Sequence, residues 1–250
     1  MIKNKEEIFL IESAGNIVAR THKHLIPYIK EGITTKELEK LANEYIKKEG
    51  ATSSFKDLGG YPGYICTSIN DEVVHGIPSD IKLNDGDIIS IDIGACYKGY
   101  HADSAWTYAV GNISKEKRYL LEHTEKALEE GLKKVKVGNH IGDISKAIDE
   151  YATLKNLGIV RELVGHGVGK ELHEYPDIPN FISKDIGPII EEGMVIAIEP
   201  MLNLGDSKVW LLEDDWTIAT KDGLPSAHFE HTVLVTKEGY KILTEEVENG

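Results

Sequence analysis

An internal repeat restricts the fold of this chain more than any other feature of its sequence. Residues 85–92, Asp-Gly-Asp-Ile-Ile-Ser-Ile-Asp, align with residues 192–199, Glu-Gly-Met-Val-Ile-Ala-Ile-Glu. Each copy has an acidic residue and a glycine, which are typical of a turn, and then an apolar strand that reaches a carboxylate. A second pair, His-Ala-Asp at 101–103 and His-Phe-Glu at 228–230, follows in the same order. Two related halves would therefore bring four carboxylates to one site by pseudo-symmetry.

The spacing of apolar residues predicts a mixed α/β (α+β) chain. Helical periodicity marks four segments, and short apolar or alternating runs mark the strands. The expected helices span residues 4–30, 34–50, 114–135 and 140–157. The expected strands span residues 87–95, 100–110, 193–203, 208–212, 216–220, 226–236 and 240–243. Thr34 with Glu37 fits a capping box, Ser114 can cap the third helix, and the glycine-rich residues 58–64 suit a loop.

Length and composition exclude several classes of protein. The 250 residues can bury a substantial core, as one large domain or two small ones. No stretch approaches the roughly 18 consecutive apolar residues of a membrane span, and the N-terminus lacks the apolar run of a signal peptide. The net charge of −14 argues against non-specific binding to nucleic acid. Only two cysteines, Cys66 and Cys96, are present, so a disulfide framework is not expected and the reducing cytoplasm is the expected location.

Three of the acidic residues lie in unusually apolar surroundings. Asp92 is flanked by isoleucines on both faces of its strand, Glu199 follows Val-Ile-Ala-Ile, and Glu230 precedes Thr-Val-Leu-Val. A carboxylate that is buried without a partner costs several kcal/mol or takes up a proton. Salt bridges are the ordinary remedy, but few lysines or arginines lie near these strands. A divalent cation is the better partner for the set.

The geometry of a hairpin links Asp92 to Asp103. If Lys98 and Gly99 form a two-residue loop, Asp103 lies opposite Gly94, which shares a face with Asp92. The two acids are then diagonal neighbours about 7–8 Å apart at the backbone, and both can reach one ion. A three-residue loop would place them on opposite faces, and lysine is not an ideal first residue for a type I′ turn.

Seven of the ten histidines fall into two groups. His22, His24, His123 and His140 lie on or beside expected helices, and we expect them to be exposed. His166 and His173 fall in a glycine-rich segment, residues 165–174, that matches neither a dinucleotide-binding nor a Walker A loop. We therefore expect small residues there to let the backbone approach a ligand while His166 donates a nitrogen. His75 is a third candidate.

The composition of this candidate site indicates its chemistry. Oxygen ligands with a single imidazole suit manganese, iron(II) or cobalt at least as well as zinc. The sequence contains no C-x-x-C or H-E-x-x-H zinc pattern and no G-x-S-x-G nucleophile elbow. Four carboxylates would balance the charge of two divalent ions, as in a two-metal hydrolase.

At these positions the sequence resembles the type I methionine aminopeptidases, over essentially the whole chain. The segments that carry the resemblance are 66–78 (Cys-Thr-Ser-Ile-Asn-Asp-Glu-Val-Val-His-Gly-Ile-Pro), 91–94 (Ile-Asp-Ile-Gly), 99–104 (Gly-Tyr-His-Ala-Asp-Ser), 165–169 (Gly-His-Gly-Val-Gly), 173–176 (His-Glu-Tyr-Pro), 198–201 (Ile-Glu-Pro-Met) and 229–232 (Phe-Glu-His-Thr). The resemblance implies a pita-bread fold, in which two pseudo-symmetric halves with antiparallel sheet and flanking helices surround a dinuclear metal site. It also implies one catalytic domain over residues 1–250.

The resemblance assigns roles residue by residue. The implied metal ligands are Asp92, Asp103, His166, Glu199 and Glu230, holding two divalent ions from among cobalt, manganese, iron(II), nickel and zinc. His75 and His173 fall where the family keeps histidines that contact substrate without binding metal. The methionine pocket is expected to be lined by Tyr61, Cys66, Leu172 and Trp216. Two positions depart from the pattern: Leu172 stands where many relatives have phenylalanine, and His228 where many have glutamine.

The resemblance also implies an activity, the removal of initiator methionine from new polypeptides whose second residue is small. Glu199 is expected to shuttle the proton, His173 to stabilise the oxyanion, and His75 to orient the peptide near the leaving nitrogen. The expected substrates are nascent N-termini, met by a cytoplasmic monomer that contacts the ribosome transiently and binds neither membrane nor specific nucleic acid.

Two other functions remain open on the same fold. An X-Pro aminopeptidase or prolidase shares the five ligands, but residues 66–78 and 226–231 favour the methionine enzyme, and those relatives usually carry an additional N-terminal domain. A catalytically inactive peptide-binding module is the second alternative. Such proteins usually lose metal ligands, whereas all five are present here.

Overall fold

The computed structural model describes residues 1–245; residues 246–250, which belong to the expected catalytic domain, lie outside the described part. The helices are α1 (Lys5–Leu25), α2 (Thr35–Lys48), α3 (Lys115–Leu132) and α4 (Ile141–Leu154), with short 3-10 turns at Ile26–Tyr28 and Leu58–Gly60. The strands are β1 (Thr52–Ser53), β2 (Cys66–Ile69), β3 (Glu72–Val74), β4 (Ile88–Tyr97), β5 (Tyr100–Ala109), β6 (Gly158–Ile159), β7 (Gly165–Gly167), β8 (Glu174–Ile178), β9 (Val195–Ile198), β10 (Met201–Asn203), β11 (Val209–Leu211), β12 (Ile218–Thr220), β13 (Ser226–His228), β14 (His231–Thr236) and β15 (Gly239–Ile242).

The helix ends follow from local chemistry. The expected capping box is confirmed at α2, where the Thr34 hydroxyl accepts from the Glu37 N–H and the Glu37 carboxylate accepts from the Thr34 N–H. Ser114 caps α3, as expected. The first helix was expected to run to residue 30, but α1 stops at Leu25, because Pro27 has no N–H to continue the helical ladder and the chain tightens into a 3-10 turn.

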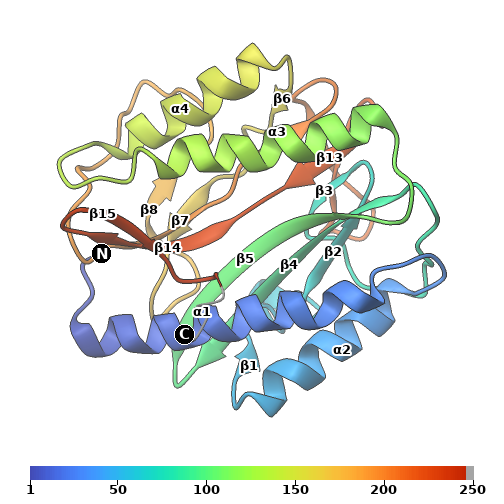
Figure 1. The fold of residues 1–250 in the computed structure, drawn as a ribbon, viewed down its shortest axis with the longest axis horizontal. Coiled ribbons are helices and arrows are strands. Elements are labelled where there is room, and N and C mark those ends of the chain that lie inside the picture. The colour runs from blue at the N-terminus through green and yellow to red at the C-terminus, as the bar shows by residue number, and fades with distance from the viewer. Residues whose placement is uncertain (246–250) are drawn as a thin grey trace.

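Within residues 1–245 all strand pairs are antiparallel, and they form four sheets. One sheet joins β5 along one edge of β4, with β1 and β2 along the other edge. A five-stranded sheet has the order β15-β14-β9-β7-β8. Two three-stranded sheets, β13-β10-β6 and β11-β12-β3, complete the structure. The strands lie between the helix pair α3–α4 and the helix pair α1–α2 (Figure 1).

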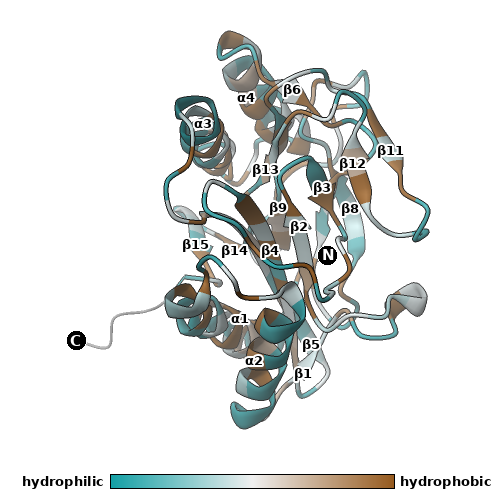
Figure 2. Ribbon diagram, turned by 90° about the vertical axis from the view of Figure 1, so that its right-hand side faces the viewer, coloured by the Kyte–Doolittle hydropathy of each residue, from teal (hydrophilic) through white to brown (hydrophobic). Residues whose placement is uncertain are grey.

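Two hydrophobic clusters confirm the pseudo-symmetry that the repeat predicts. Apolar residues of α1 and α2 pack on β4, including Ile17, Leu38 and Ile91. Apolar residues of α3 and α4 pack on β9 and β14, including Leu128 and Ile196. Each half is thus a helix pair over an antiparallel strand pair, and in Figure 2 the two helix pairs lie on the same side of the sheets. Among residues 1–245, none of the helices has the length and apolar character that crossing a bilayer requires.

The halves are joined along β5 and the start of β14. The Glu230 N–H donates to the Ala105 carbonyl at 2.8 Å, and the Ser104 hydroxyl donates to the Glu230 carbonyl at 2.8 Å. The Thr232 hydroxyl donates to the Asp103 carbonyl at 2.8 Å. The residues of the repeat therefore meet across this seam.

The structure corrects several expectations. Strands 193–203 and 226–236 are each interrupted, at Glu199-Pro200 and at Phe229-Glu230, and Pro200 cannot donate to a ladder. Strands β1 to β3 and β6 to β8 were not predicted. The expected exposure of the four helix histidines is wrong: His22 and His123 are buried, and His24 and His140 are half-buried. His22 lies between the Tyr108 hydroxyl and the Ser104 carbonyl, each 3.0 Å from a ring nitrogen, and His123 contacts the Tyr151 hydroxyl at 2.9 Å.

Candidate metal centre and peptide pocket

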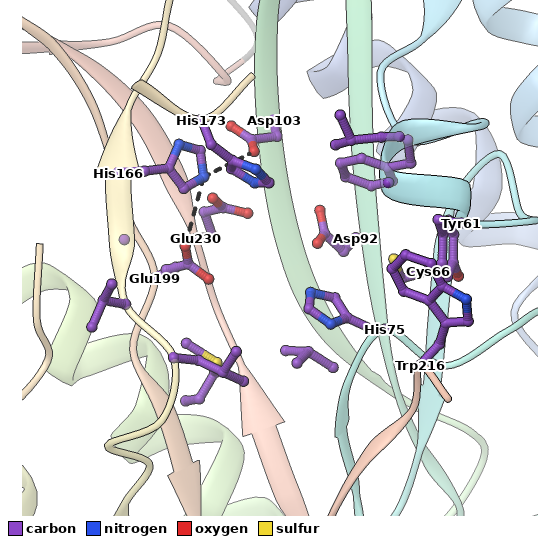
Figure 3. Close-up of a pocket in the computed structure, with 18 of the residues that line it drawn as sticks. Tyr61, Cys66, His75, Asp92, Asp103, His166, His173, Glu199, Trp216 and Glu230 are labelled. Atoms are coloured by element: carbon purple, nitrogen blue, oxygen red, sulfur yellow. Dashed lines mark ion pairs between the residues drawn. The ribbon is translucent and has the colours of Figure 1, made fainter. Parts of the chain in front are cut away.

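The candidate site is a cavity of about 550 Å³ where the two halves meet. Its lining combines the expected metal ligands with the expected peptide-binding residues (Figure 3). The residues that line it are Phe55, Leu58, Gly59, Tyr61, Cys66, Val74, His75, Asp92, Asp103, Glu162, Leu163, Val164, Gly165, His166, His173, Asp177, Glu199, Met201, Trp216 and Glu230. All the expected metal ligands and pocket residues lie in this lining except Leu172, and His228, the other departure from the family pattern, is absent from it too.

The β4–β5 hairpin has the predicted register. Gly94 pairs with Asp103 and Asp92 pairs with Ala105, so the loop contains only Lys98 and Gly99. Both loop residues have positive φ, 50° and 82°, as a type I′ turn requires. Asp92 and Asp103 consequently lie on one face of the hairpin, and their side chains point into the cavity (Figure 3).

Glu199 and Glu230 enter the cavity from strand ends. Glu199 directly follows β9, and Glu230 directly precedes β14. The two glutamates lie next to each other because their chain neighbours, Ile198 and His231, are paired in the sheet. The Asn180 amide donates to the Glu199 carbonyl at 3.0 Å and so occupies an acceptor that the strand ladder leaves free. Asn180 is fully buried and was not identified in the sequence, because it lies in a loop 19 residues before its partner.

His166 presents one ring nitrogen to the carboxylates. Its Nδ1 lies 3.0 Å from the Gly167 carbonyl, which can only accept, so Nδ1 carries the proton. The other nitrogen, Nε2, lies 3.4 Å from the Asp103 carboxylate and 3.7 Å from the Glu199 carboxylate. This is the tautomer and orientation of a metal-binding histidine.

Burial and crowding shift the pKa values of these groups. Burial, with the nearby charges of Asp103 and Glu199, raises the pKa of Asp92 well above its usual range. Burial raises the pKa of Glu230 in the same way. Burial opposes ionisation of Asp103, but the adjacent His166 outweighs it and lowers the pKa of that carboxyl. Burial lowers the pKa of His166, but the neighbouring Asp103 carboxylate outweighs burial and raises that pKa to about 9.

The donor set fits divalent cations. The Asp92 Oδ1 atom is buried without a hydrogen-bond partner in the described part of the chain. Within residues 1–245, the residues that line the cavity include no lysine or arginine that could balance the charge of the carboxylates. Two sets of donor atoms lie within 4.8 Å of one another: those of Asp103, His166 and His173, and those of His166, Glu199 and Glu230. Positive charge at this point would offset the burial of the carboxylates.

Two positions within this centre refine the expectation. Asp92 belongs to neither set of closely spaced donors. His173, expected to contact substrate only, shares a set with Asp103 and His166, and its ring lies edge-on to His166 with the centroids 4.4 Å apart. The geometry thus allows His173 a position beside an ion as well as beside substrate.

An apolar pocket adjoins the carboxylates. Tyr61, Cys66, Leu172 and Phe55 form one buried cluster, and Trp216 meets Tyr61 edge-on with the ring centroids 5.2 Å apart. Leu172 packs in this cluster without reaching the cavity lining. Phe55 was missed in the sequence, where nothing distinguishes it from an ordinary core residue. Burial lowers the pKa of His75 and of His173, which favours their neutral forms.

His228 is the second departure from the family pattern. It is buried, and its Nε2 lies 3.5 Å from the Glu199 carboxylate without a hydrogen-bond partner within residues 1–245. Glu199 therefore lies between two histidines, His166 at one oxygen and His228 at the other.

Fold and site together define a metal-dependent peptidase built from two pseudo-symmetric halves. Residues 10–237 match metallopeptidase family M24, and the chain belongs to this family. Methionine aminopeptidases are among its relatives. The chain is 52% identical to methionine aminopeptidase 1 of Bacillus subtilis over 242 residues, covering 97% of this chain and 98% of the relative. It is 46% identical to methionine aminopeptidase of Clostridium perfringens over 244 residues, covering 98% of each.

Solved structures agree with the sequence relatives. Methionine aminopeptidase from Thermotoga maritima superposes with a TM-score of 0.96 at 42% identity, covering 98% of this chain and 99% of that one. A prolidase from Pyrococcus furiosus superposes with a TM-score of 0.78 at 28% identity, covering 99% of this chain but 66% of the prolidase. The expected pita-bread fold is confirmed, and the methionine aminopeptidases match it over their whole length.

Proposed function

We propose that this protein is a metalloaminopeptidase that removes N-terminal methionine from polypeptides whose second residue is small. The observation that carries the proposal is the 52% identity to methionine aminopeptidase 1 of Bacillus subtilis along nearly the whole of both chains. The cavity supports it, because carboxylates and an imidazole lie beside an apolar pocket that can receive a hydrophobic side chain. The prolidase alternative is weaker, because the prolidase from Pyrococcus furiosus is only 28% identical to this chain and this chain covers only 66% of its length.

The proposed metal ligands are Asp92, Asp103, His166, Glu199 and Glu230, which would hold two divalent ions. Cobalt, manganese, iron(II), nickel and zinc are all compatible with this mixture of oxygen and nitrogen donors. Bound ions of this kind polarise a carbonyl and lower the pKa of water to near 7. The His166 Nε2 atom loses its proton when it binds a metal, so metal affinity should fall as the pH falls.

The remaining residues handle the peptide. The Glu199 carboxylate accepts the proton of the attacking water and returns it to the leaving nitrogen. His173, beside His166, hydrogen-bonds to the oxyanion that develops on the scissile carbonyl. His75, which also lines the cavity (Figure 3), orients the peptide. Tyr61, Cys66 and Trp216 receive the methionine side chain, and Leu172 supports them from behind.

The proposal includes the setting of the reaction. One catalytic domain over residues 1–250 would act as a monomer in the cytoplasm on the N-termini of new chains, with transient contact to the ribosome. An acidic chain of net charge −14 would make that contact through local basic residues and not through its overall charge.

Two peptides test the assignment. Metal-stripped protein is given Mn²⁺, Fe²⁺ or Co²⁺ in turn and offered Met-Ala-Ser and Ala-Pro-Ser. Cleavage of Met-Ala-Ser alone is expected, whereas cleavage of Ala-Pro-Ser alone would overturn the assignment in favour of a prolidase.

One variant tests the role of His173. His173→Ala should lower kcat by roughly a hundredfold or more, because an oxyanion donor is lost, while metal content stays near two ions per chain. Elemental analysis of the same preparation supplies the control. Unchanged turnover would remove His173 from the mechanism.

A further inference from the structure

The N-terminal segment continues the strand system of the second half. Ile2 forms an antiparallel bridge with Met194, and the Lys3 N–H donates to the Gly193 carbonyl at 2.8 Å. Met194 directly precedes β9, the strand that leads to Glu199. Both ribbon views place the N-terminus near β8 (Figures 1 and 2). The first residues therefore lie close to the catalytic cavity and not at a remote end of the fold.

The side chain of Lys3 forms an ion pair with Glu174, 171 residues away in the sequence. Both side chains are largely removed from solvent, with 9% of Lys3 and 21% of Glu174 exposed. Burial alone would raise the pKa of Glu174, but the contact with Lys3 lowers it. Lys3 is therefore the cation that balances this largely buried carboxylate, and the backbone N–H groups of Glu171 and Lys170 stabilise its charge further.

Glu174 in turn fixes the loop between β7 and β8. Its second oxygen accepts from the Glu171 N–H at 3.3 Å. Glu174 and Lys3 also pack directly on Gly169, where an added methyl group would collide with both side chains. At the start of the loop, the Gly169 carbonyl accepts from the His101 N–H of β5 at 2.9 Å. The segment 169–174 is thus held at one end by β5. At the other end Glu174 pairs with Gly167 in the β7–β8 ladder, and the Lys3–Glu174 ion pair adds a side-chain restraint to that pairing.

His173 is the residue of this loop that enters the cavity. Within residues 1–245 its ring makes no hydrogen bond of its own, and its ring contact is the edge-on approach to His166. The position of the ring therefore depends on the backbone that carries it. That backbone continues directly into Glu174.

We propose that Lys3 is a positioning residue for His173, acting through its buried ion pair with Glu174. The proposal rests on the catalytic role of His173 given above. Without Lys3, the uncompensated Glu174 carboxylate would move toward solvent and carry the adjacent His173 with it. A displacement of about 1 Å in a group that stabilises a transition state is enough to reduce turnover substantially.

The experiment compares Lys3→Met and Glu174→Gln with the unaltered enzyme on Met-Ala-Ser, and then repeats Lys3→Met in a His173→Ala background. Two variants of the pair are used so that a folding defect in one does not decide the result. The matched control is Lys241→Met, which breaks the Lys241–Glu12 pair, a 2.5 Å contact that also joins distant segments but is more exposed, at 46% and 28%. Kinetic constants, metal content and thermal unfolding are measured for each protein.

The expected result is a fall in kcat of about tenfold for Lys3→Met and for Glu174→Gln, with KM and metal content unchanged. Lys241→Met should change kcat less than twofold. In the His173→Ala background, Lys3→Met should also change kcat less than twofold, because residues that act as a unit are not additive.

Two results would overturn the proposal. One is a normal kcat for Lys3→Met in an enzyme that His173→Ala impairs; the other is an equal loss from Lys3→Met with and without His173, which indicates general destabilisation. If His173→Ala itself retains full activity, the assigned role of His173 is wrong and the inference falls with it, whereas the peptide-cleavage assay still decides the function separately.

Discussion

The two halves of this fold place their carboxylates by different means. In the first half, Asp92 and Asp103 lie inside two unbroken ten-residue strands, and the ladder register decides which face they occupy. In the second half, Glu199 and Glu230 lie where strands stop or start. The sequence repeat is therefore a repeat of residue types, and the structural solution differs between its two copies.

The difference makes the second half dependent on the first. Because Glu230 lies outside the ladder, its N–H and carbonyl are paired with Ala105 and Ser104 of β5. Asp103 is also held by Thr232, whose hydroxyl lies 3.0 Å from the carboxylate. The β4–β5 hairpin thus serves as the template on which Glu230, a proposed metal ligand of the other half, is aligned.

A register shift in this hairpin tests the dependence, and it should have the largest effect. Insertion of one glycine after Gly99 makes a three-residue loop and moves Asp103 to the opposite face, since a slip of one residue reverses every side chain. Ala105 and Ser104 move too, so Glu230 loses its anchors. We expect kcat/KM to fall about a thousandfold and metal content to drop below one ion per chain.

A glycine inserted beside Gly223 provides the control. This residue has a φ of 72° and open space around it, in an exposed turn between β12 and β13. Activity should be retained there within about twofold. Full metal content and turnover in the Gly99 insertion variant would refute the template role of the hairpin.

The features that could be predicted from the sequence depend on local geometry. The register of the hairpin follows from the number of residues in its turn, and the cap of α2 follows from Thr34 and Glu37. The repeat identified the pairs of acids because it preserves their spacing from an acid-glycine turn. None of these inferences requires knowledge of which segments meet in space. The exception is the inference that the carboxylates of both halves share one bound cation as their partner.

The features that could not be predicted depend on contacts between distant segments. β7 contains only Gly165, His166 and Gly167, so it offers no side-chain alternation, and its strand character comes from pairing with β8 and β9. Asn180 and Lys3 act on partners that no spacing rule connects to them. These positions become visible only when the tertiary structure is known.

The error at His22 had a signal that could have been used. His22 lies four residues after Val18 and three before Leu25, both buried, and so falls on the apolar stripe of α1. Its helical position thus indicates burial, although its residue type alone favours exposure. A histidine on a buried stripe needs two hydrogen-bond partners, and the structure supplies Tyr108 and Ser104.

A neutral histidine is buried on each side of the seam between the halves, and this burial should make the stability of the protein fall in acid. Burial lowers the pKa of His22 and of His231 from 6.5 to about 4. Between pH 6.5 and 4 the unfolded chain takes up protons that the folded chain refuses, so stability is complete above pH 6.5 and is lost as the pH falls toward 4. Each histidine should contribute about 3 kcal/mol to this loss.

Urea unfolding at pH 7 and at pH 4.5 measures the effect. His22→Gln should reduce the dependence on pH by about the share of one histidine. His24→Gln, two residues along the same helix where the ring stacks on Tyr45, should leave the dependence as it is. An unchanged slope for His22→Gln would show that His22 is not the group that titrates.

The smallest effect concerns the turns that close a hairpin in each half. Lys98 begins the β4–β5 turn with a φ of 50°, a left-handed conformation that asparagine adopts more readily than lysine. Lys98→Asn should therefore raise the free energy of unfolding by about 0.5–1 kcal/mol, even after loss of the contact between Lys98 and the Tyr97 ring, with kcat and metal content unchanged.

Lys237 offers the matched position in the other half, because it begins the two-residue β14–β15 turn without a positive φ. Lys237→Asn should give no gain, and equal stabilisation by both substitutions would mean that the strained turn is not what distinguishes the first half.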